Sequence, residues 1–378
     1  MIMDAKKHRK HTKLSLKETG NYASCEIAIL GVKCAVIANL SQDIAKKLQK
    51  TIKIGYLDAS HYFDETAPFL DTFTFNDNGI LNLNAATTLN KFNARIQFLA
   101  YDLVLINGNH YQGNQQIVIL DNDKEASIIK RIDQITDIKF LIKLQDNSKI
   151  FDCLKNKFPE INSLPIYNIT DIESIANHIE ALTNAHIPAL NGLVLAGGKS
   201  VRMGKDKGLL AYHGEAQRDY LFNLMTKVLG ENSEIFLSVR AEQNIDTVPV
   251  ITDKFIGLGP FGAICSAFMH NPNTAYLVVA TDLPFVNQDV LELLLRQRNP
   301  KKIATAIKGK NKPFMEPLIT IWEPKAYPVL LSYLAQGYSC PRKVLINSDV
   351  EIVEIDDAFI QNINTPDEFE AVKKEIGK

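Results

Sequence analysis

The chain has 378 residues, a formal net charge of −1, 46% hydrophobic residues and 22% charged residues. This composition is typical of a globular protein, and the length exceeds what one hydrophobic core usually serves, which predicts two domains. The near-neutral charge excludes a global attraction to nucleic acid or to an anionic membrane, so we expect neither as a partner and any anion site to be local.

Cysteine usage and the N-terminal segment indicate the compartment. The five cysteines lie far apart without a C-x-x-C pair, which argues against a zinc site and a disulfide framework and fits a reducing cytoplasm. The basic start of the chain is followed by no apolar signal region. We interpret it as a solvated tail, with a nucleic-acid-binding arm as the alternative, and expect a cytoplasmic protein.

Strand-like runs alternate with helical patterns along the chain, which predicts α/β domains with largely parallel sheets. A helix is predicted over Asn39–Leu48, where Leu40, Ile44 and Leu48 lie four residues apart. The first half, residues 1–185, is predicted to be a doubly wound domain. Its predicted strands are Glu26–Leu30, Ile52–Leu57, Leu103–Ile106, Ile117–Leu120 and Lys139–Ile142. A further helix is predicted before the domain boundary, over Thr170–Leu182.

Periodicity lapses around Pro188, so residues 186–190 are predicted as a linker and residues 191–378 as a second α/β domain. Its predicted strands are Leu193–Ala196, Ile235–Val239, Ala275–Ala280, Ile303–Ile307, Leu318–Trp322 and Glu351–Ile355. Its predicted helices are Gln217–Leu229, Gly262–Met269, Gln288–Arg296, Lys325–Ala335 and Pro366–Ile376.

The strand Leu193–Ala196 runs into a loop rich in glycine and cations. Without a Cβ, Gly197 and Gly198 allow backbone N–H groups to approach an anion closely. Four cations follow within nine residues, at Lys199, Arg202, Lys205 and Lys207. The loop is therefore typical of a triphosphate-binding turn, although a solvated turn has the same spacing.

Two aspartates follow predicted strands in this half. Asp282 comes after Ala275–Ala280, and Asp253 precedes a glycine-rich turn into a helix. In open α/β sheets ligands bind outside the carboxyl ends of the strands, so both carboxylates are expected beside the glycine loop. A carboxylate there can hold Mg²⁺ against triphosphate oxygens, whereas a turn cap is the alternative for Asp282.

From Asn191 onward the chain resembles molybdenum cofactor guanylyltransferases. The matching motifs are Leu195–Gly198, Ser200–Gly204, Asp206-Lys207, Asp253 with Gly259-Pro260, Asp282–Pro284 and Asn362–Glu368. The resemblance implies a nucleotide-diphospho-sugar transferase-like fold and covers about half of the chain. It departs from the family pattern at Ser238, where asparagine is frequent, and at Glu316-Pro317, where a histidine-proline pair is frequent.

The resemblance also implies roles for individual residues. Arg202, Lys207 and Asp282 would be catalytic, and Asp282 would hold Mg²⁺. Asn362 and Asn364 would contact the pterin substrate. The implied nucleotide-binding residues are Leu195, Ala196, Gly197, Gly198, Lys207, Ser238, Asp253 and Asp282.

The implied reaction transfers GMP from GTP to molybdenum-molybdopterin and releases pyrophosphate. The nucleophile is already an anionic phosphate, so no general base is expected and catalysis is mostly alignment and charge neutralisation. One alternative is a cytidylyltransferase acting on the same cofactor or on a sugar or alcohol phosphate. A second alternative is a catalytically silent carrier or scaffold for the cofactor.

The segment Ile27–Asn39 in the first half occupies the place of a P-loop, but it has one glycine, Gly31, and lacks G-x-x-x-x-G-K-[ST]. Together with Leu57–His61 and Asp102–His110, it resembles the adapter protein of guanine dinucleotide cofactor synthesis, a P-loop fold, in degenerate form. Nucleotide hydrolysis is not expected here.

We interpret His61 and His110 as ordinary polar loop residues, and Asp58 and Asn107 likewise, with a metal or phosphate site as the alternative. The expected role of the first domain is structural or docking. It would present the pterin or a recipient molybdoenzyme, which would then be a further partner.

Overall fold

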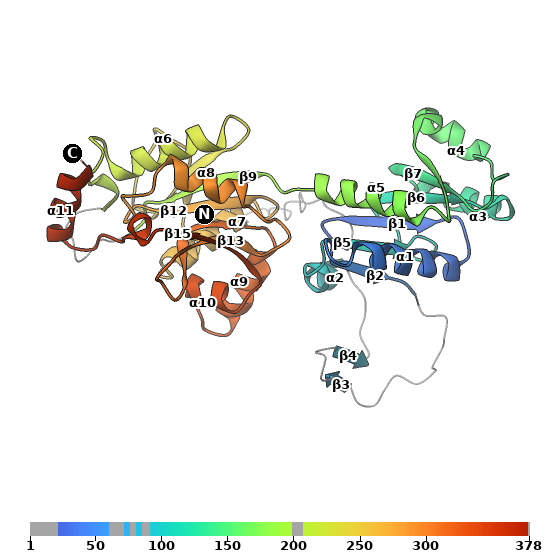
Figure 1. Cartoon of the computed structure of the whole chain (residues 1–378), viewed down its shortest axis with the longest axis horizontal. Helices are drawn as coiled ribbons and strands as arrows, with labels where there is room; N and C mark the ends of the chain where they lie inside the picture. Colours follow the sequence, from blue (N-terminus) through green and yellow to red (C-terminus); the bar gives the residue numbers. More distant parts are fainter. Residues whose placement is uncertain (1–21, 60–71, 76–80, 85–90, 199–206, 377–378) are drawn as a thin grey trace, which may run out of the picture. The chain divides into compact units, whose positions relative to one another are not determined.

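The computed structural model describes residues 22–59, 72–75, 81–84, 91–198 and 207–376. The chain divides into two compact units, Met1–His186 and Ile187–Lys378, each with its own sheet (Figure 1). The division falls within the residues predicted as a linker. The predicted basic tail, His61, Lys199, Arg202 and Lys205 lie outside the described residues.

The first unit holds a six-stranded sheet in the order β2–β5–β1–β6–β7–β8, in which every pair is parallel. This confirms the predicted α/β class with a parallel sheet. The strands are β1 (Glu26–Leu30), β2 (Ile54–Leu57), β5 (Leu103–Asn107), β6 (Gln115–Leu120), β7 (Ile138–Lys143) and β8 (Ile166–Asn168). A separate antiparallel pair is formed by β3 (Thr72–Phe75) and β4 (Leu81–Asn84).

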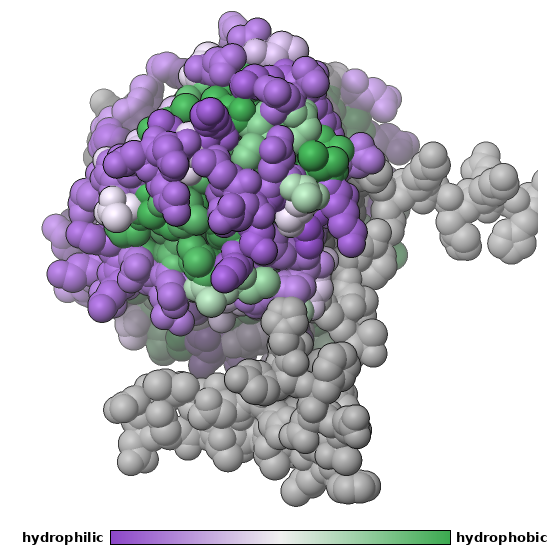
Figure 2. All heavy atoms as spheres, turned by 90° about the vertical axis from the view of Figure 1, so that its right-hand side faces the viewer, coloured by the Kyte–Doolittle hydropathy of each residue, from purple (hydrophilic) through white to green (hydrophobic). Residues whose placement is uncertain are grey.

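Apolar side chains cover both faces of this sheet, because successive residues of a strand point to opposite sides. Ile27 and Ile29 of β1 belong to a core with α1 and α5, whereas Leu30 packs with α3 and α4. The helices are α1 (Cys34–Leu48), α2 (Lys91–Phe98), α3 (Glu125–Lys130), α4 (Asp152–Lys157) and α5 (Ile172–Ala185). Figure 2 shows a face on which hydrophobic side chains gather in patches between hydrophilic ones.

The link between β1 and α1 differs from a P-loop. Strand β1 ends at Leu30 and α1 begins at Cys34, five residues earlier than predicted. The turn depends on Gly31, which has φ 106° and where a Cβ would lie 2.2 Å from the Ile119 carbonyl oxygen. A P-loop signature spans about eight residues, so a link this short has no room for its phosphate cradle.

The second unit holds a seven-stranded sheet in the order β11–β10–β9–β12–β14–β13–β15. Strand β14 is antiparallel to both neighbours, and the other pairs are parallel. The strands are β9 (Leu190–Leu195), β10 (Ile235–Val239), β11 (Val250–Thr252), β12 (Ala275–Ala280), β13 (Ala304–Gly309), β14 (Met315–Trp322) and β15 (Val350–Ile355). The largely parallel α/β sheet is thus confirmed.

Helices cover both faces of the second sheet, with α6 packed against α8 and α7 against α9 (Figure 1). They are α6 (Gln217–Leu229), α7 (Pro260–His270), α8 (Gln288–Arg296), α9 (Ala326–Ala335), α10 (Pro341–Ile346) and α11 (Pro366–Ile376). Trp322, the chain's one tryptophan, is fully buried in this core. Among the helices of the described ranges, none is long and apolar enough to cross a membrane.

Candidate nucleotide-binding site

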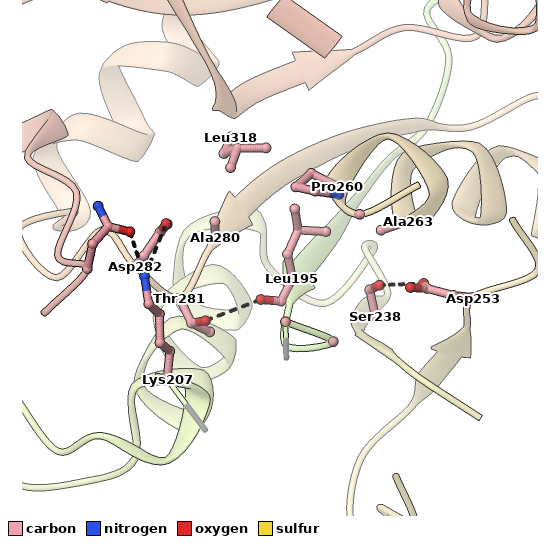
Figure 3. A pocket seen from close by; sticks show the side chains of 14 residues that line it. Leu195, Lys207, Ser238, Asp253, Pro260, Ala263, Ala280, Thr281, Asp282 and Leu318 are labelled. Carbon is pink, nitrogen blue, oxygen red and sulfur yellow. Dashed lines mark hydrogen bonds and ion pairs between the residues drawn. The ribbon is translucent and has the colours of Figure 1, made fainter. Parts of the chain in front are cut away.

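The carboxyl ends of β9, β10 and β12 surround a cavity of about 380 Å³ (Figure 3). Eight of the residues predicted from the sequence line it: Leu195, Gly197, Gly198, Lys207, Ser238, Asp253, Asp282 and Asn364. Parallel strands present their carboxyl ends at one edge, which explains why motifs far apart in the chain meet here.

Asp282 lies just beyond β12, at the side of the cavity where Lys207 enters (Figure 3). Its Oδ2 is 3.9 Å from the Lys207 Nζ, and its Oδ1 is buried without a hydrogen-bond partner. Burial raises the pKa of the Asp282 carboxyl, although the Lys207 charge opposes the shift. A buried carboxylate oxygen without a donor is costly, and a bound cation would satisfy it.

The Lys207 ammonium binds the segment after the glycine loop to the turn before the last helix. Its Nζ donates to the Ile363 carbonyl oxygen at 2.7 Å and to the Asn364 Oδ1 at 2.9 Å. The Ile363 N–H in turn donates to the Asp282 carbonyl oxygen. The predicted lysine, aspartate and second asparagine therefore form one cluster.

On the other side of the cavity Asp253 faces Ser238. The Ser238 hydroxyl donates to the Asp253 Oδ1 at 2.8 Å, and the Asp253 N–H continues the ladder to Val239. Burial raises the pKa of the Asp253 carboxyl, whereas the Ser238 hydrogen bond and the Arg240 charge lower it, with a net upward shift. Ser238 thus orients this carboxylate.

The carbonyl oxygens of the glycine loop are held from outside the cavity. The Arg240 guanidinium donates to the Gly197 carbonyl oxygen at 2.6 Å, and the Gln243 amide donates to that of Ala196 at 3.2 Å. In a trans peptide the carbonyl and the next N–H point in opposite directions. These contacts therefore aim the N–H groups of Gly197 and Gly198 away from Arg240 and Gln243.

The glycine-rich turn before α7 forms another wall of the cavity. Gly259 precedes α7 with φ 57°, and Pro260 and Ala263 line the cavity. A Cβ on Gly262 would lie 2.2 Å from the Phe255 carbonyl oxygen, so this position requires glycine. The first N–H groups of a helix lack partners within the helix and favour anions.

The sequence motifs did not identify every residue that lines the cavity, and some of the residues that they predicted are not found in its lining. Gly259 and Pro260, which belong to a predicted motif, line the cavity, and so do Ala263, Ala280, Thr281 and Leu318, which no motif marked. Thr281, next to Asp282, was recoverable from its neighbour, but Leu318 comes from β14 and carries no chemical signature. Ala196 does not line the cavity, and Arg202 lies outside the described residues.

The two predicted pterin contacts belong to different cavities. Asn364 lines the first, whereas Asn362 lines a second cavity of about 690 Å³ together with Glu316, Lys312 and Arg342. Burial raises the pKa of the Glu316 carboxyl despite the nearby Arg342, and the Asn362 Oδ1 is buried without a partner. The two asparagines flank Ile363, so one turn borders both cavities.

Comparisons with known proteins agree with this geometry. Residues 192–351 match the model of the MobA-like NTP transferase domain. The chain is 31% identical over 199 residues to a probable molybdenum cofactor guanylyltransferase of Clostridium perfringens, covering 48% of this chain and 96% of that protein. It is 33% identical over 185 residues to a molybdenum cofactor biosynthesis bifunctional protein of Synechocystis, covering 48% of this chain and 52% of that one.

A solved structure, molybdopterin-guanine dinucleotide biosynthesis protein A of Archaeoglobus fulgidus, is 22% identical, with 50% of this chain and 98% of that chain covered and a TM-score of 0.42. The chain spans about half the length of the Synechocystis relative. The site at the sheet edge and the similarity to these relatives identify the second unit as a domain of the NTP transferase class. By this family match together with 31% identity to the Clostridium perfringens relative, of which the chain covers 96%, the chain belongs to the MobA-like NTP transferase family.

Proposed function

We propose that the second unit transfers GMP from GTP to molybdenum-molybdopterin, giving the guanine dinucleotide and pyrophosphate. The observation that carries the proposal is the cluster of Lys207, Asp282 and Asn364 at the edge of the cavity that the glycine loop borders. It joins a cation for phosphate, a carboxylate for metal and the turn that resembles the family's pterin contact. The names of the two relatives support the same pathway.

Asp282 fits a Mg²⁺ ion, because its Oδ1 is buried and lacks a hydrogen-bond donor. Within the described residues, no group of three His, Cys, Asp or Glu side chains that could hold a metal is found. Mg²⁺ is commonly held by one or two carboxylates together with substrate phosphates, and Asp282 would supply such a carboxylate. When bound, the ion neutralises phosphate charge.

The residues of this chain then align the reactants. The N–H groups of the glycine loop bind phosphate oxygens, and Lys207 offsets the charge that develops as pyrophosphate leaves. Arg202 would add a second cation from the same loop. The terminal phosphate of molybdopterin attacks the α-phosphorus of GTP, and no protein side chain has to accept a proton.

For the first unit we propose a docking role without nucleotide hydrolysis, as an adapter-like domain with a degenerate P-loop. The three-residue link between β1 and α1 supports the absence of hydrolysis. Exposed hydrophobic side chains, including Ile96 and Ile129, support docking of the pterin or a recipient molybdoenzyme. The purified chain should release no inorganic phosphate from GTP or ATP, and steady phosphate release would contradict this role.

The test mixes the purified chain with Mg²⁺, molybdenum-molybdopterin and either GTP or CTP, and quantifies pyrophosphate and dinucleotide by mass spectrometry. Product from GTP alone supports the proposal. Product from CTP instead identifies a cytidylyltransferase, and product from neither, with tight cofactor binding, identifies a carrier. Replacing Mg²⁺ by EDTA should abolish the product.

A further inference from the structure

A second cluster of reactive side chains lies in the first unit, where β1 and β5 end side by side. Cys34, the first residue of α1, has its Sγ 3.2 Å from the His110 Nε2. The Asn109 amide nitrogen lies 3.6 Å from the same sulfur. Cys34 and His110 are both half-buried, so the thiol is partly accessible to solvent.

A hydrogen-bonded carboxylate lies beside this pair. The Asp58 Oδ1 is 3.9 Å from the His110 Nε2 and accepts a hydrogen bond from the Asn107 amide at 2.9 Å. Its Oδ2 accepts a hydrogen bond from the Tyr56 hydroxyl at 2.8 Å. The His110 Nε2 is thus within reach of both the Cys34 sulfur and a carboxylate oxygen, a geometry in which it can take up the thiol proton.

The surroundings of Cys34 differ from those of the structural thiols. Burial raises the pKa of the Cys34 thiol, but hydrogen bonds from Asn107, Asn109 and His110 oppose this and the net shift is downward. Burial instead raises the pKa of Cys25 to about 11 and that of Cys265 to about 12. Cys25 and Cys265 therefore stay protonated near neutral pH.

We propose that Cys34 and His110 form a reactive thiolate–imidazolium pair that exchanges with low-molecular-weight disulfides. His110 accepts the thiol proton, and the thiolate attacks one sulfur of the disulfide. A bond from Sγ to that sulfur forms as the old S–S bond breaks, and the departing thiolate takes the proton from His110. One disulfide is consumed and one is formed, so the step balances without another oxidant.

This proposal is independent of the nucleotidyl transfer assigned to the second unit. It also changes the interpretation of His110 from an ordinary loop residue to the partner of a nucleophile. Asn109 supports the geometry, since its amide also donates to the Val32 carbonyl oxygen at 2.8 Å and thereby fixes the turn against the start of α1.

The experiment treats the reduced full chain with oxidised glutathione near pH 7 and follows each cysteine by peptide mass spectrometry. Cys340 is exposed and serves as the internal reference. Each unit by which a thiol pKa falls gives about tenfold more thiolate but about threefold lower nucleophilicity. Since the gain in thiolate exceeds the loss of nucleophilicity, we expect Cys34 to react faster than Cys340, and a rate equal to or below that of Cys340 overturns the proposal.

A matched pair of variants separates the role of His110 from general accessibility. His110→Ala should slow modification of Cys34 and make its rate depend more steeply on pH between about 7 and 9, since Tyr56 and Asp58 remain as the facing titratable groups. His186→Ala, at an exposed position of the same unit, should change neither. In denaturant the rates of Cys34 and Cys340 should converge. An unchanged Cys34 rate in His110→Ala, or a Cys34 advantage that persists in denaturant, contradicts the pair.

Discussion

Lys207 and Asp282 lie 3.9 Å apart, Nζ to Oδ2, although the lysine begins a short helical turn after the glycine loop and the aspartate follows β12. Lys207 also binds the turn at Ile363 and Asn364. One cation thus contacts the carboxylate proposed for the metal and the turn proposed for the pterin. Lys207 therefore lies between the proposed sites of the nucleotide and of the pterin, and substitutions at Lys207 and Asp282 are the most informative.

Asp282→Asn keeps the shape of the side chain but removes its charge. Without a carboxylate for Mg²⁺, we expect nucleotidyl transfer to fall by about 100-fold or more. Initial rates of pyrophosphate release at several Mg²⁺ concentrations measure the effect. Asp289→Asn, in the first turn of α8 and exposed, is the matched control and should keep native rates. Native activity of Asp282→Asn would remove the metal assignment.

Asp282→Asn should lower activity but raise the stability of the fold, by an amount that depends on pH. The folded pKa of Asp282 lies above its ordinary value of 3.8, so between the two values the folded chain binds the proton more tightly than the unfolded chain. The contribution of this carboxyl to the free energy of unfolding therefore falls as pH rises through that window. Asp282→Asn should be more stable than the native chain at pH 7, with the difference shrinking toward pH 4.

Urea unfolding followed by the fluorescence of Trp322 measures this difference, because the single tryptophan reports on the second unit. A native chain that is the more stable of the two at pH 7 would show that Lys207 outweighs the cost of burying the Asp282 carboxylate.

Much of this site could be predicted because its chemistry lies in local motifs. The strand Leu193–Ala196 with Gly197 and Gly198, and Asp282 after a buried strand, each carry their signal within a few residues. The contact between Lys207 and Ile363 spans 156 residues and depends on how the chain returns to the sheet edge, which no local pattern encodes.

The first half shows the same limit. The predicted ends of the first strand agree with those of β1, and all five of its residues are buried. The three-residue edge strand β8 and the short helices α3 and α4 have too few residues for a hydrophobic period to be recognised. The contact between Cys34 and His110 was missed because each residue alone is an ordinary loop or helix-end residue.

Arg240 is expected to position the glycine loop rather than to contact substrate. Arg240→Ala removes a charged hydrogen bond to the Gly197 carbonyl oxygen, which typically contributes about 1.5–3 kcal/mol. The Kd for GTP should therefore rise by about tenfold or more, with a smaller change in kcat. Glu242→Gln weakens the neighbouring ion pair at 2.7 Å but keeps the bond to Gly197, and should bind GTP normally. Equal GTP affinities of native and Arg240→Ala chains would contradict this role.

Gly262→Ala tests the turn between Asp253 and α7. The added Cβ would lie 2.2 Å from the Phe255 carbonyl oxygen, so the backbone has to move, at a cost of about 1–3 kcal/mol. Gly198→Ala is the control, since its Cβ would meet nothing within 4 Å, and its stability should stay within about 0.5 kcal/mol of native. Urea unfolding monitored by Trp322 compares them, and equal midpoints for both variants would show that the turn adapts.

Lys207→Met retains the apolar stem and removes the ammonium. Two effects should follow: phosphate charge is no longer offset, and the turn at Asn364 loses the donor that holds it at 2.9 Å. We expect kcat to fall by about 100-fold, as for loss of one charged donor in other active sites, and the KM for the cofactor to rise. Lys227→Met, on the exposed side of α6, is the control and should leave both parameters unchanged. Steady-state kinetics with GTP and with cofactor varied in turn separates the effects. A Lys207→Met chain in which only the GTP parameters change would assign the lysine to the nucleotide alone and leave the turn to position the pterin without it.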